Sequence, residues 1–249
     1  MTETKRAGDL RIDGLAVSYG ANTALTGVSA AIPAGSIVGL IGPNGSGKST
    51  LLKAVAGVAG ASSGTITLAD APIKHRGSEV AFVPQREEVN WDFPVTARDV
   101  VLMGRYRAVG WLRRPGREDR ERAESAMARL GLEGMGSRHI SQFSGGQQQR
   151  VFLARAMVQD PELVLLDEPF TGIDVRNREV FHGAIQEFAA QGITVLIATH
   201  DLDEVRSTTT HVLCLNRRMV AFGPTPTTFT PENLRATFGG QLAVFEAAP

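Results

Sequence analysis

The hydrophobic residues of this chain form short, almost wholly apolar runs that alternate with longer amphipathic stretches. The runs predict strands, and they lie at residues 37–41, 163–166 and 193–198. The longer stretches predict helices, at residues 49–56, 117–130, 151–158 and 176–190. Strands separated by helices imply parallel βαβ units, so the pattern indicates an α/β fold with a mostly parallel sheet.

Shorter segments near both ends of the chain predict additional strands. Residues 10–32 show several short alternating pieces around a turn at 20–22. Near the C-terminus, two apolar segments flank a tight turn at Asn216–Arg217 and predict a hairpin. The remaining predicted strands are at residues 65–68 and 80–83.

Residues 90–145 differ from the rest, because their apolar runs are short and arginines are frequent. We expect a helical insertion between sheet elements here. The arginines could form a phosphate or nucleic-acid patch. The neighbouring Glu118, Asp119, Glu121 and Glu124 favour a solvated surface of mixed charge instead.

The overall charge gives no electrostatic argument for nucleic acid or anionic lipid, since 26 basic residues balance 26 acidic ones. The single cysteine, Cys214, lies in an apolar run and is expected in the core. The N-terminus carries no secretory signal. Residues 14–47 are uncharged, but Pro33 and several glycines interrupt them, so we expect strands and turns rather than a membrane span.

A glycine-rich segment after the strand at 37–41 is the first candidate for chemistry. It fits G-x-x-x-x-G-K-[ST] and opens a helix. Glycines let backbone N–H groups approach phosphate oxygens, and the helix N-terminus favours negative charge. Lys48 can reach the β- and γ-phosphates, and the Ser49 hydroxyl can ligate Mg²⁺. The predicted phosphate-binding residues are Gly42, Pro43, Asn44, Gly45, Ser46, Gly47, Lys48, Ser49 and Thr50.

Two further strands end in residues suited to hydrolysis. Asp167 and Glu168 follow the strand at 163–166, and His200 follows the strand at 193–198. Ligands of α/β sheets lie outside the carboxyl ends of such strands. Asp167 can hold Mg²⁺ through water, and Glu168 can orient and deprotonate an attacking water. His200 can donate a hydrogen bond to a γ-phosphate.

A second glycine turn opens the helix that continues through residue 157. Ser144 and Gln147 have the spacing of a capping box, and Gly145 and Gly146 between them leave N–H groups free for an anion. One glycine loop already accounts for one nucleotide. The residues alone leave open whose phosphate the second anion site binds.

This set of motifs resembles the nucleotide-binding subunit of an ATP-binding cassette (ABC) transporter over nearly the whole chain. By that resemblance Tyr19 stacks on adenine, although packing on a strand face is the structural alternative. Gln85 contacts Mg²⁺ and water, and Asp174 lies in a loop crossing a dimer interface. Residues 143–147 match the family signature, with Phe143 where leucine is usual. His200 matches the switch histidine.

The resemblance implies one ABC ATPase domain over residues 1–249, with ATP and Mg²⁺ as cofactors. Its core would comprise about 8–89 and 150–249, including an antiparallel β-subdomain, and its helical subdomain about 90–149. Two copies would pair head to tail, each signature closing over ATP on the other. The implied location is the cytoplasmic face of the plasma membrane. The implied partners are a separate membrane permease and, indirectly, a substrate-binding protein, but no nucleic acid.

Residues 90–106 and 110–115 are similar to those of importers of manganese, zinc or iron ions. Import of iron–siderophore, haem or vitamin B12 is the nearest alternative. A cassette acting on DNA would carry a coiled-coil or zinc insertion before the signature, and none is present here. A binding-only scaffold is disfavoured by the presence of Glu168 and His200.

Overall fold

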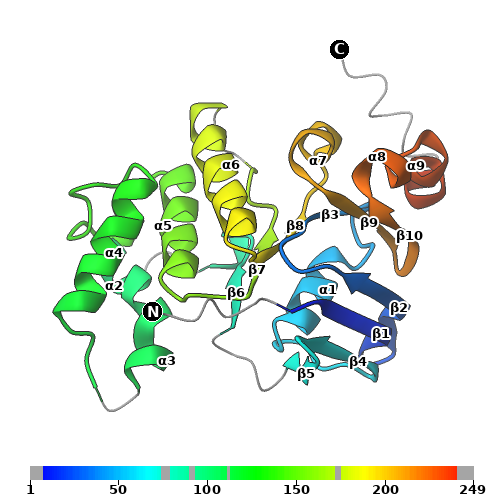
Figure 1. Ribbon diagram of the computed structural model, residues 1–249, viewed down its shortest axis with the longest axis horizontal. Coiled ribbons are helices and arrows are strands. Elements are labelled where there is room, and N and C mark those ends of the chain that lie inside the picture. The colour runs from blue at the N-terminus through cyan, green and yellow to red at the C-terminus, as the bar shows by residue number, and fades with distance from the viewer. Residues whose placement is uncertain (1–7, 74–78, 90–92, 111–112, 172–174, 240–249) are drawn as a thin grey trace.

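A computed structural model describes residues 8–73, 79–89, 93–110, 113–171 and 175–239. Near the N-terminus lies an antiparallel sheet with the order β2-β1-β4-β5 (Figure 1). Its strands are β1 (Leu10–Tyr19), β2 (Asn22–Ile32), β4 (Ser63–Leu68) and β5 (Ala71–Pro72). The first strand is continuous, whereas the sequence predicted two short pieces. Irregular register between Ile12 and Ser18 breaks the alternation that sequence reasoning uses.

The second sheet has six strands in the order β10-β9-β3-β8-β7-β6. Its pairings are parallel except for the β9–β10 hairpin. The strands are β3 (Ile37–Ile41), β6 (Val80–Val83), β7 (Leu163–Asp167), β8 (Thr194–Ala198), β9 (His211–Asn216) and β10 (Arg218–Pro224). This mostly parallel sheet confirms the α/β fold expected from the apolar runs.

Both faces of this sheet are covered, which explains why its central strands are apolar at every position. On β7, Leu163 and Leu165 pack toward α1 (Lys48–Val55) and the antiparallel sheet. Val164 and Leu166 pack toward α5 (Gly145–Met157) and α6 (Val175–Ala190) on the other face. In Figure 1, α1 lies between the two sheets.

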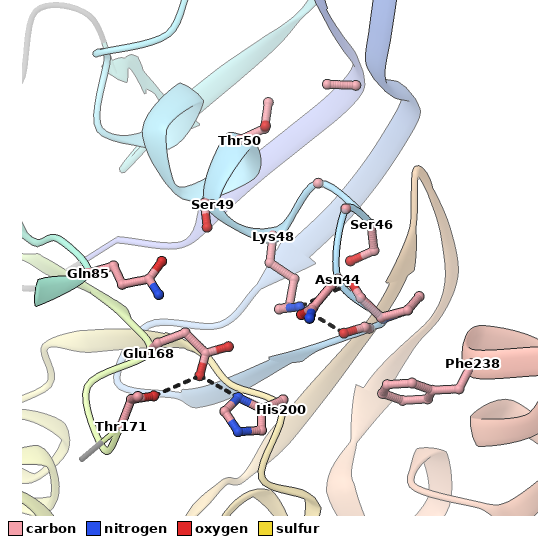
Figure 2. A pocket seen from close by; sticks show the side chains of 15 residues that line it. Asn44, Ser46, Lys48, Ser49, Thr50, Gln85, Glu168, Thr171, His200 and Phe238 are labelled. Carbon is pink, nitrogen blue, oxygen red and sulfur yellow. Dashed lines mark hydrogen bonds and ion pairs between the residues drawn. The ribbon is translucent and has the colours of Figure 1, made fainter. Parts of the chain in front are cut away.

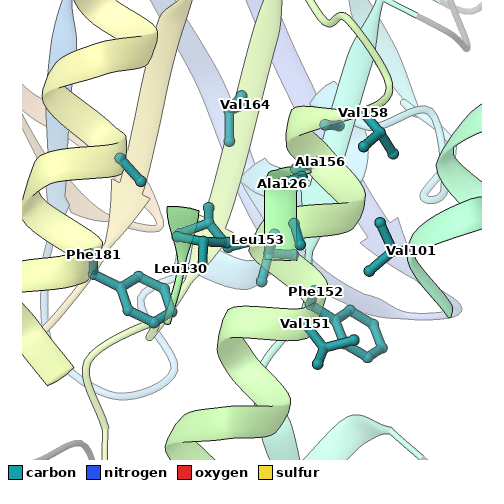
Figure 3. Close-up of a cluster of buried hydrophobic side chains, with 14 of the residues drawn as sticks. Val101, Ala126, Leu130, Val151, Phe152, Leu153, Ala156, Val158, Val164 and Phe181 are labelled. Atoms are coloured by element: carbon teal, nitrogen blue, oxygen red, sulfur yellow. The ribbon is translucent and has the colours of Figure 1, made fainter. Parts of the chain in front are cut away.

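Helices α2 to α5 form a helical group at the end of the molecule opposite the antiparallel sheet (Figure 1). Its α-helices before α5 are α2 (Ala97–Leu102), α3 (Tyr106–Val109) and α4 (Arg117–Arg129). Short 3₁₀ turns are η2 (Arg86–Glu88), η3 (Met103–Arg105) and η4 (Ile140–Gln142). Figure 3 shows its core, in which Val101, Ala126 and Leu130 lie with α5 side chains.

Several arginines of this group pair with acids, and one of these pairs is more buried than the expected mixed-charge surface. Arg105 Nε bonds Asp119 Oδ1 at 2.9 Å, and the two side chains are 12% and 15% exposed. Arg117–Glu121 and Arg122–Glu118 are exposed helical pairs, as anticipated. Arg105 therefore stabilises the packing of η3 against α4, whereas the other pairs contribute little.

The C-terminal part packs beside β3. It contains α7 (Leu202–Thr208), the predicted β9–β10 hairpin, α8 (Thr225–Thr228) and α9 (Pro231–Phe238). Cys214 is fully buried in β9, as predicted from its apolar neighbours, and burial raises the pKa of its thiol. Within the described ranges, every helix is too short or too polar to cross a lipid bilayer.

Candidate active site

The phosphate-binding loop joins β3 to α1, the order that the glycine motif predicted. A Cβ atom on Gly42 would lie 2.0 Å from the backbone oxygen of Leu215. Gly47 has φ +99°, and a Cβ there would lie 2.4 Å from Leu25 Cδ2. The backbone can take this path only with glycine at both positions.

The turn of the C-terminal hairpin supports the loop from behind. Arg217 N donates to Ser46 O at 2.8 Å, and Thr26 N donates to Arg217 O at 2.8 Å. The Ser46 side-chain hydroxyl is buried and has no hydrogen-bond partner among the described residues. A buried hydroxyl of this kind needs a partner, and a phosphate oxygen in the loop could supply one.

Lys48 folds back over the loop. Its Nζ donates to Gly42 O at 2.7 Å and to Pro43 O at 3.2 Å. Burial lowers the pKa of Lys48, and the nearby charges of Glu168 and Asp167 oppose that shift. The ammonium group therefore lies between the loop carbonyls and the two acids, where a phosphate would provide a stronger partner than a carbonyl.

Asp167 ends β7 and is fully buried. Neither carboxylate oxygen has a hydrogen-bond partner among the described residues. Burial raises its pKa, and Ser49, whose hydroxyl lies near but outside hydrogen-bond geometry, lowers it to a smaller extent. A buried carboxylate with unused oxygens beside a serine hydroxyl fits the oxygen ligands that Mg²⁺ prefers.

Glu168 and His200 meet across neighbouring strands, as Figure 2 shows. His200 Nδ1 lies 2.8 Å from Glu168 Oε2, and the Thr171 hydroxyl donates to the same oxygen at 3.4 Å. Because β7 pairs with β8, the residues after these strands end at one edge of the sheet. Glu168 also has φ +49°, a left-handed conformation that costs about 1–2 kcal/mol in a non-glycine residue.

These residues line one cavity of about 590 Å³. Its predicted members are residues 42–50, Gln85, Glu168 and His200. Sequence reasoning missed Ala24, Thr171 and Phe238, which also line it. Thr171 stands three residues after Glu168 and could have been found from that spacing. Nothing in the sequence links Phe238 to the loop, because α9 reaches the cavity only through its packing on β9.

Several predicted site residues do not line this cavity, among them Asp167 beside it and residues 144–147. Tyr19 does not line the cavity and is 54% exposed. Ser144 is exposed at the start of α5 and also lies outside this cavity. Asp174 falls outside the described residues.

The start of α5 has the capping box that the sequence predicted. Ser144 N donates to Gln147 Oε1 at 2.9 Å, and Gln147 N donates to Ser144 Oγ at 3.4 Å. Gly145 is partly exposed and Gly146 buried within this turn. Phe143 is buried before it, with the Arg138 guanidinium 5.1 Å from the ring centroid. Phenylalanine therefore packs normally where leucine was expected.

A glycine loop joins β3 to α1, a histidine follows the adjacent strand β8, and two acids lie at the end of β7 beyond it. This arrangement defines a P-loop nucleotide-hydrolysing protein. The family model described as "ABC transporter" matches residues 25–171. The chain therefore belongs to the ABC transporter family, whose nucleotide-binding domain is an ATPase.

Two relatives span almost the whole chain. The manganese transport system ATP-binding protein MntB of Bacillus subtilis is 42% identical over 94% of this chain and 93% of its own length. The zinc transport system ATP-binding protein TroB of Treponema pallidum is 42% identical over 94% and 88%. A solved structure described as "an inward-facing conformation of a putative metal-chelate type ABC transporter" has a TM-score of 0.80 and 30% identity, covering 92% of this chain and 88% of its own.

Proposed function

We propose that this chain hydrolyses ATP to power uptake of a transition-metal ion, manganese, zinc or iron, through a separate membrane permease. The observation that carries the proposal is one cavity in which Lys48, Glu168 and His200 converge beside the buried Asp167. The relatives that transport manganese and zinc support the choice of cargo, since each covers more than nine-tenths of this chain.

The chain's own residues supply the steps of hydrolysis. Lys48 exchanges its loop carbonyls for phosphate oxygens and balances negative charge that develops in the transition state. Glu168 orients and deprotonates the attacking water, and His200 donates to the γ-phosphate. Ser49, Gln85 and Asp167 would hold Mg²⁺, which neutralises phosphate charge when bound.

A second copy of the chain completes the site in this proposal. Ser144 and the N–H groups of Gly145–Gln147 lie outside the cavity formed by their own phosphate loop. Gln147 N is used in the capping box, so the N–H groups of Gly145 and Gly146 at this helix start are the ones that fit a triphosphate held by another copy. Tyr19 would stack on adenine, which agrees with its exposed ring.

The proposed location is the inner face of the plasma membrane, where the chain would bind permease subunits that receive cargo from a substrate-binding protein. The nearest alternative cargo is iron–siderophore, haem or vitamin B12. To identify the cargo, uptake of radioactive manganese, zinc and iron is compared between parental cells and cells whose chain carries Lys48→Ala. Loss of one metal's uptake identifies the cargo, and unchanged uptake of all three contradicts metal import.

Mixing two inactive variants tests the composite site. Each site should use Lys48 from one copy and Ser144 from the other, so Lys48→Ala and Ser144→Arg should each be inactive alone. A mixture can form dimers in which one site is wholly intact. Phosphate release should therefore reappear on mixing, and a mixture as inactive as its components would contradict the pairing. The matched control is a mixture of the Lys48→Ala and Lys48→Arg variants. Every dimer in it lacks Lys48 at both sites, so phosphate release should not reappear.

A further inference from the structure

A cluster of four charged or titratable side chains joins α6 to α7, directly behind the histidine of the active site. We call it the α6–α7 cluster, and its members are Arg178, His182, Asp201 and Glu204. Arg178 donates to Asp201 Oδ2 at 3.0 Å and lies 3.7 Å from Glu204 Oε2. His182 Nε2 lies 2.6 Å from Glu204 Oε1. Arg178 and His182 of α6 thus bind two acidic side chains at the start of α7.

The two carboxylates of the cluster have several hydrogen-bond partners. Glu204 is 7% exposed and also accepts from the Thr208 hydroxyl at 3.1 Å. Burial alone would raise the pKa of Asp201, but the Glu204 backbone N–H and the Arg178 guanidinium hold it below its ordinary value. A charged network with these partners fixes the relation of two helices, whereas exposed pairs do not.

The turn that carries His200 is held on both sides. Asp201 is the N-cap of α7 and accepts from Glu204 N at 3.1 Å. On the other side, Thr199 N donates to Leu40 O at 3.1 Å, and Thr199 Oγ1 accepts from Asp201 N at 3.0 Å. Arg178 binds the second carboxylate oxygen of Asp201, so α6 fixes the residue next to His200.

The same face of α6 contacts the segment that carries Glu168. The Phe170 ring lies 5.3 Å from the His182 ring and 5.9 Å from the Phe181 ring, between centroids. Phe170 is buried two residues after Glu168. One helix therefore contacts both active-site segments, through Phe170 on one and through Asp201 and Glu204 on the other.

We propose that the α6–α7 cluster sets the 2.8 Å contact between His200 and Glu168, with Arg178 and His182 as positioning residues for ATP hydrolysis. The proposal rests on the proposed function, because it assigns these residues to the same reaction. Neither side chain lines the nucleotide cavity, so their effect must pass through His200 and Glu168.

Arg178→Gln tests the proposal, with Arg122→Gln as a matched control. Arg122 also has ion pairs and similar exposure, but it pairs with Glu118 and Asp160 away from the site. Arg178→Gln should lower kcat about tenfold and leave KM for ATP within about twofold, the pattern expected when an interaction matters in the transition state. Arg122→Gln should keep the parental kcat.

Two more variants separate positioning from a loss of folding. Arg178→Lys retains a cation opposite Asp201 and should recover most of the rate. His182→Phe keeps a ring against Phe170 but removes the donor to Glu204, and it should lose activity like Arg178→Gln. A kcat for both Arg178→Gln and His182→Phe equal to that of the control would overturn the proposal.

The double variant Arg178→Gln/His200→Ala tests most directly whether Arg178 acts through His200. If Arg178 acts through His200, then Arg178→Gln should cause no further loss in a His200→Ala background. An equal loss in both backgrounds would show an independent structural role and refute the inference. Failure of the proposed function looks different, because Glu168→Gln would then hydrolyse ATP at the parental rate.

Discussion

Replacing Asp167 by asparagine should stabilise this protein while abolishing the Mg²⁺-dependent hydrolysis proposed for it. The carboxylate is fully buried, and both its oxygens lack a hydrogen-bond partner among the described residues. An asparagine amide has nearly the same shape and costs less to bury than a charge. The substitution therefore removes an unfavourable term from the folded protein and removes an oxygen ligand from the site.

The gain is the extra cost of burying a charged group instead of a neutral amide that also lacks partners, and we take it as about 1–3 kcal/mol. Unfolding entropy of about 2.1 cal/mol/K per residue gives roughly 0.5 kcal/mol/K for 249 residues. The midpoint of thermal unfolding should rise by about 2–6 °C in the Asp167→Asn variant.

The pH dependence of stability gives an independent check. Because burial raises the pKa of Asp167, the folded protein holds this proton more tightly than the unfolded chain. Its contribution to the free energy of unfolding is thus largest below the ordinary carboxyl pKa and falls as pH rises to the raised folded value. In the Asp167→Asn variant, the free energy of unfolding should no longer show this fall with rising pH.

Thermal melts in EDTA and in Mg²⁺ with ATP measure both effects. The parent should gain stability from Mg²⁺ and ATP together, whereas Asp167→Asn should gain much less. Asp160→Asn is the control. The exposed carboxylate of Asp160 pairs with Arg105 and Arg122, so neutralising it should not raise the melting temperature. An Asp167→Asn variant that melts below the parent in EDTA would refute the reasoning.

Two further predictions concern the loop and the base. Gly42→Ala would place a methyl group 2.0 Å from Leu215 O, so the loop must shift and ATP affinity should fall at least about tenfold. Gly60→Ala, with open space around it, should bind ATP like the parent in the same fluorescence titration. Glu168→Gln should bind ATP but release phosphate at least about 100-fold more slowly. Parental turnover by that variant would mean another group is the base.

Local features of the sequence predicted the central elements well. Apolar runs predicted β3, β7 and β8 because these strands are buried on both faces and tolerate few polar residues. Ser144 and Gln147 predicted the start of α5 because a capping box depends on residues three positions apart. The glycine loop was visible for the same reason, since its motif lies within nine consecutive residues.

Features that depend on distant segments were not predictable in this way. Phe238 reaches the cavity from the last described helix, and Arg105 is buried by α4 across a loop. Pairing of α6 with α7 requires knowing how both helices pack on the sheet. No spacing rule connects Arg178 with Asp201, because helix packing and not sequence distance brings them together.

The support that Arg217 and Leu215 give to the phosphate loop affects when the protein first becomes able to bind nucleotide. During synthesis the loop leaves the ribosome well before the hairpin behind it has been made. A growing chain should therefore hold ATP only weakly until β9 and β10 have been made. Shortened chains ending before residue 211 would contain every residue of the glycine motif and still lack a firm nucleotide site.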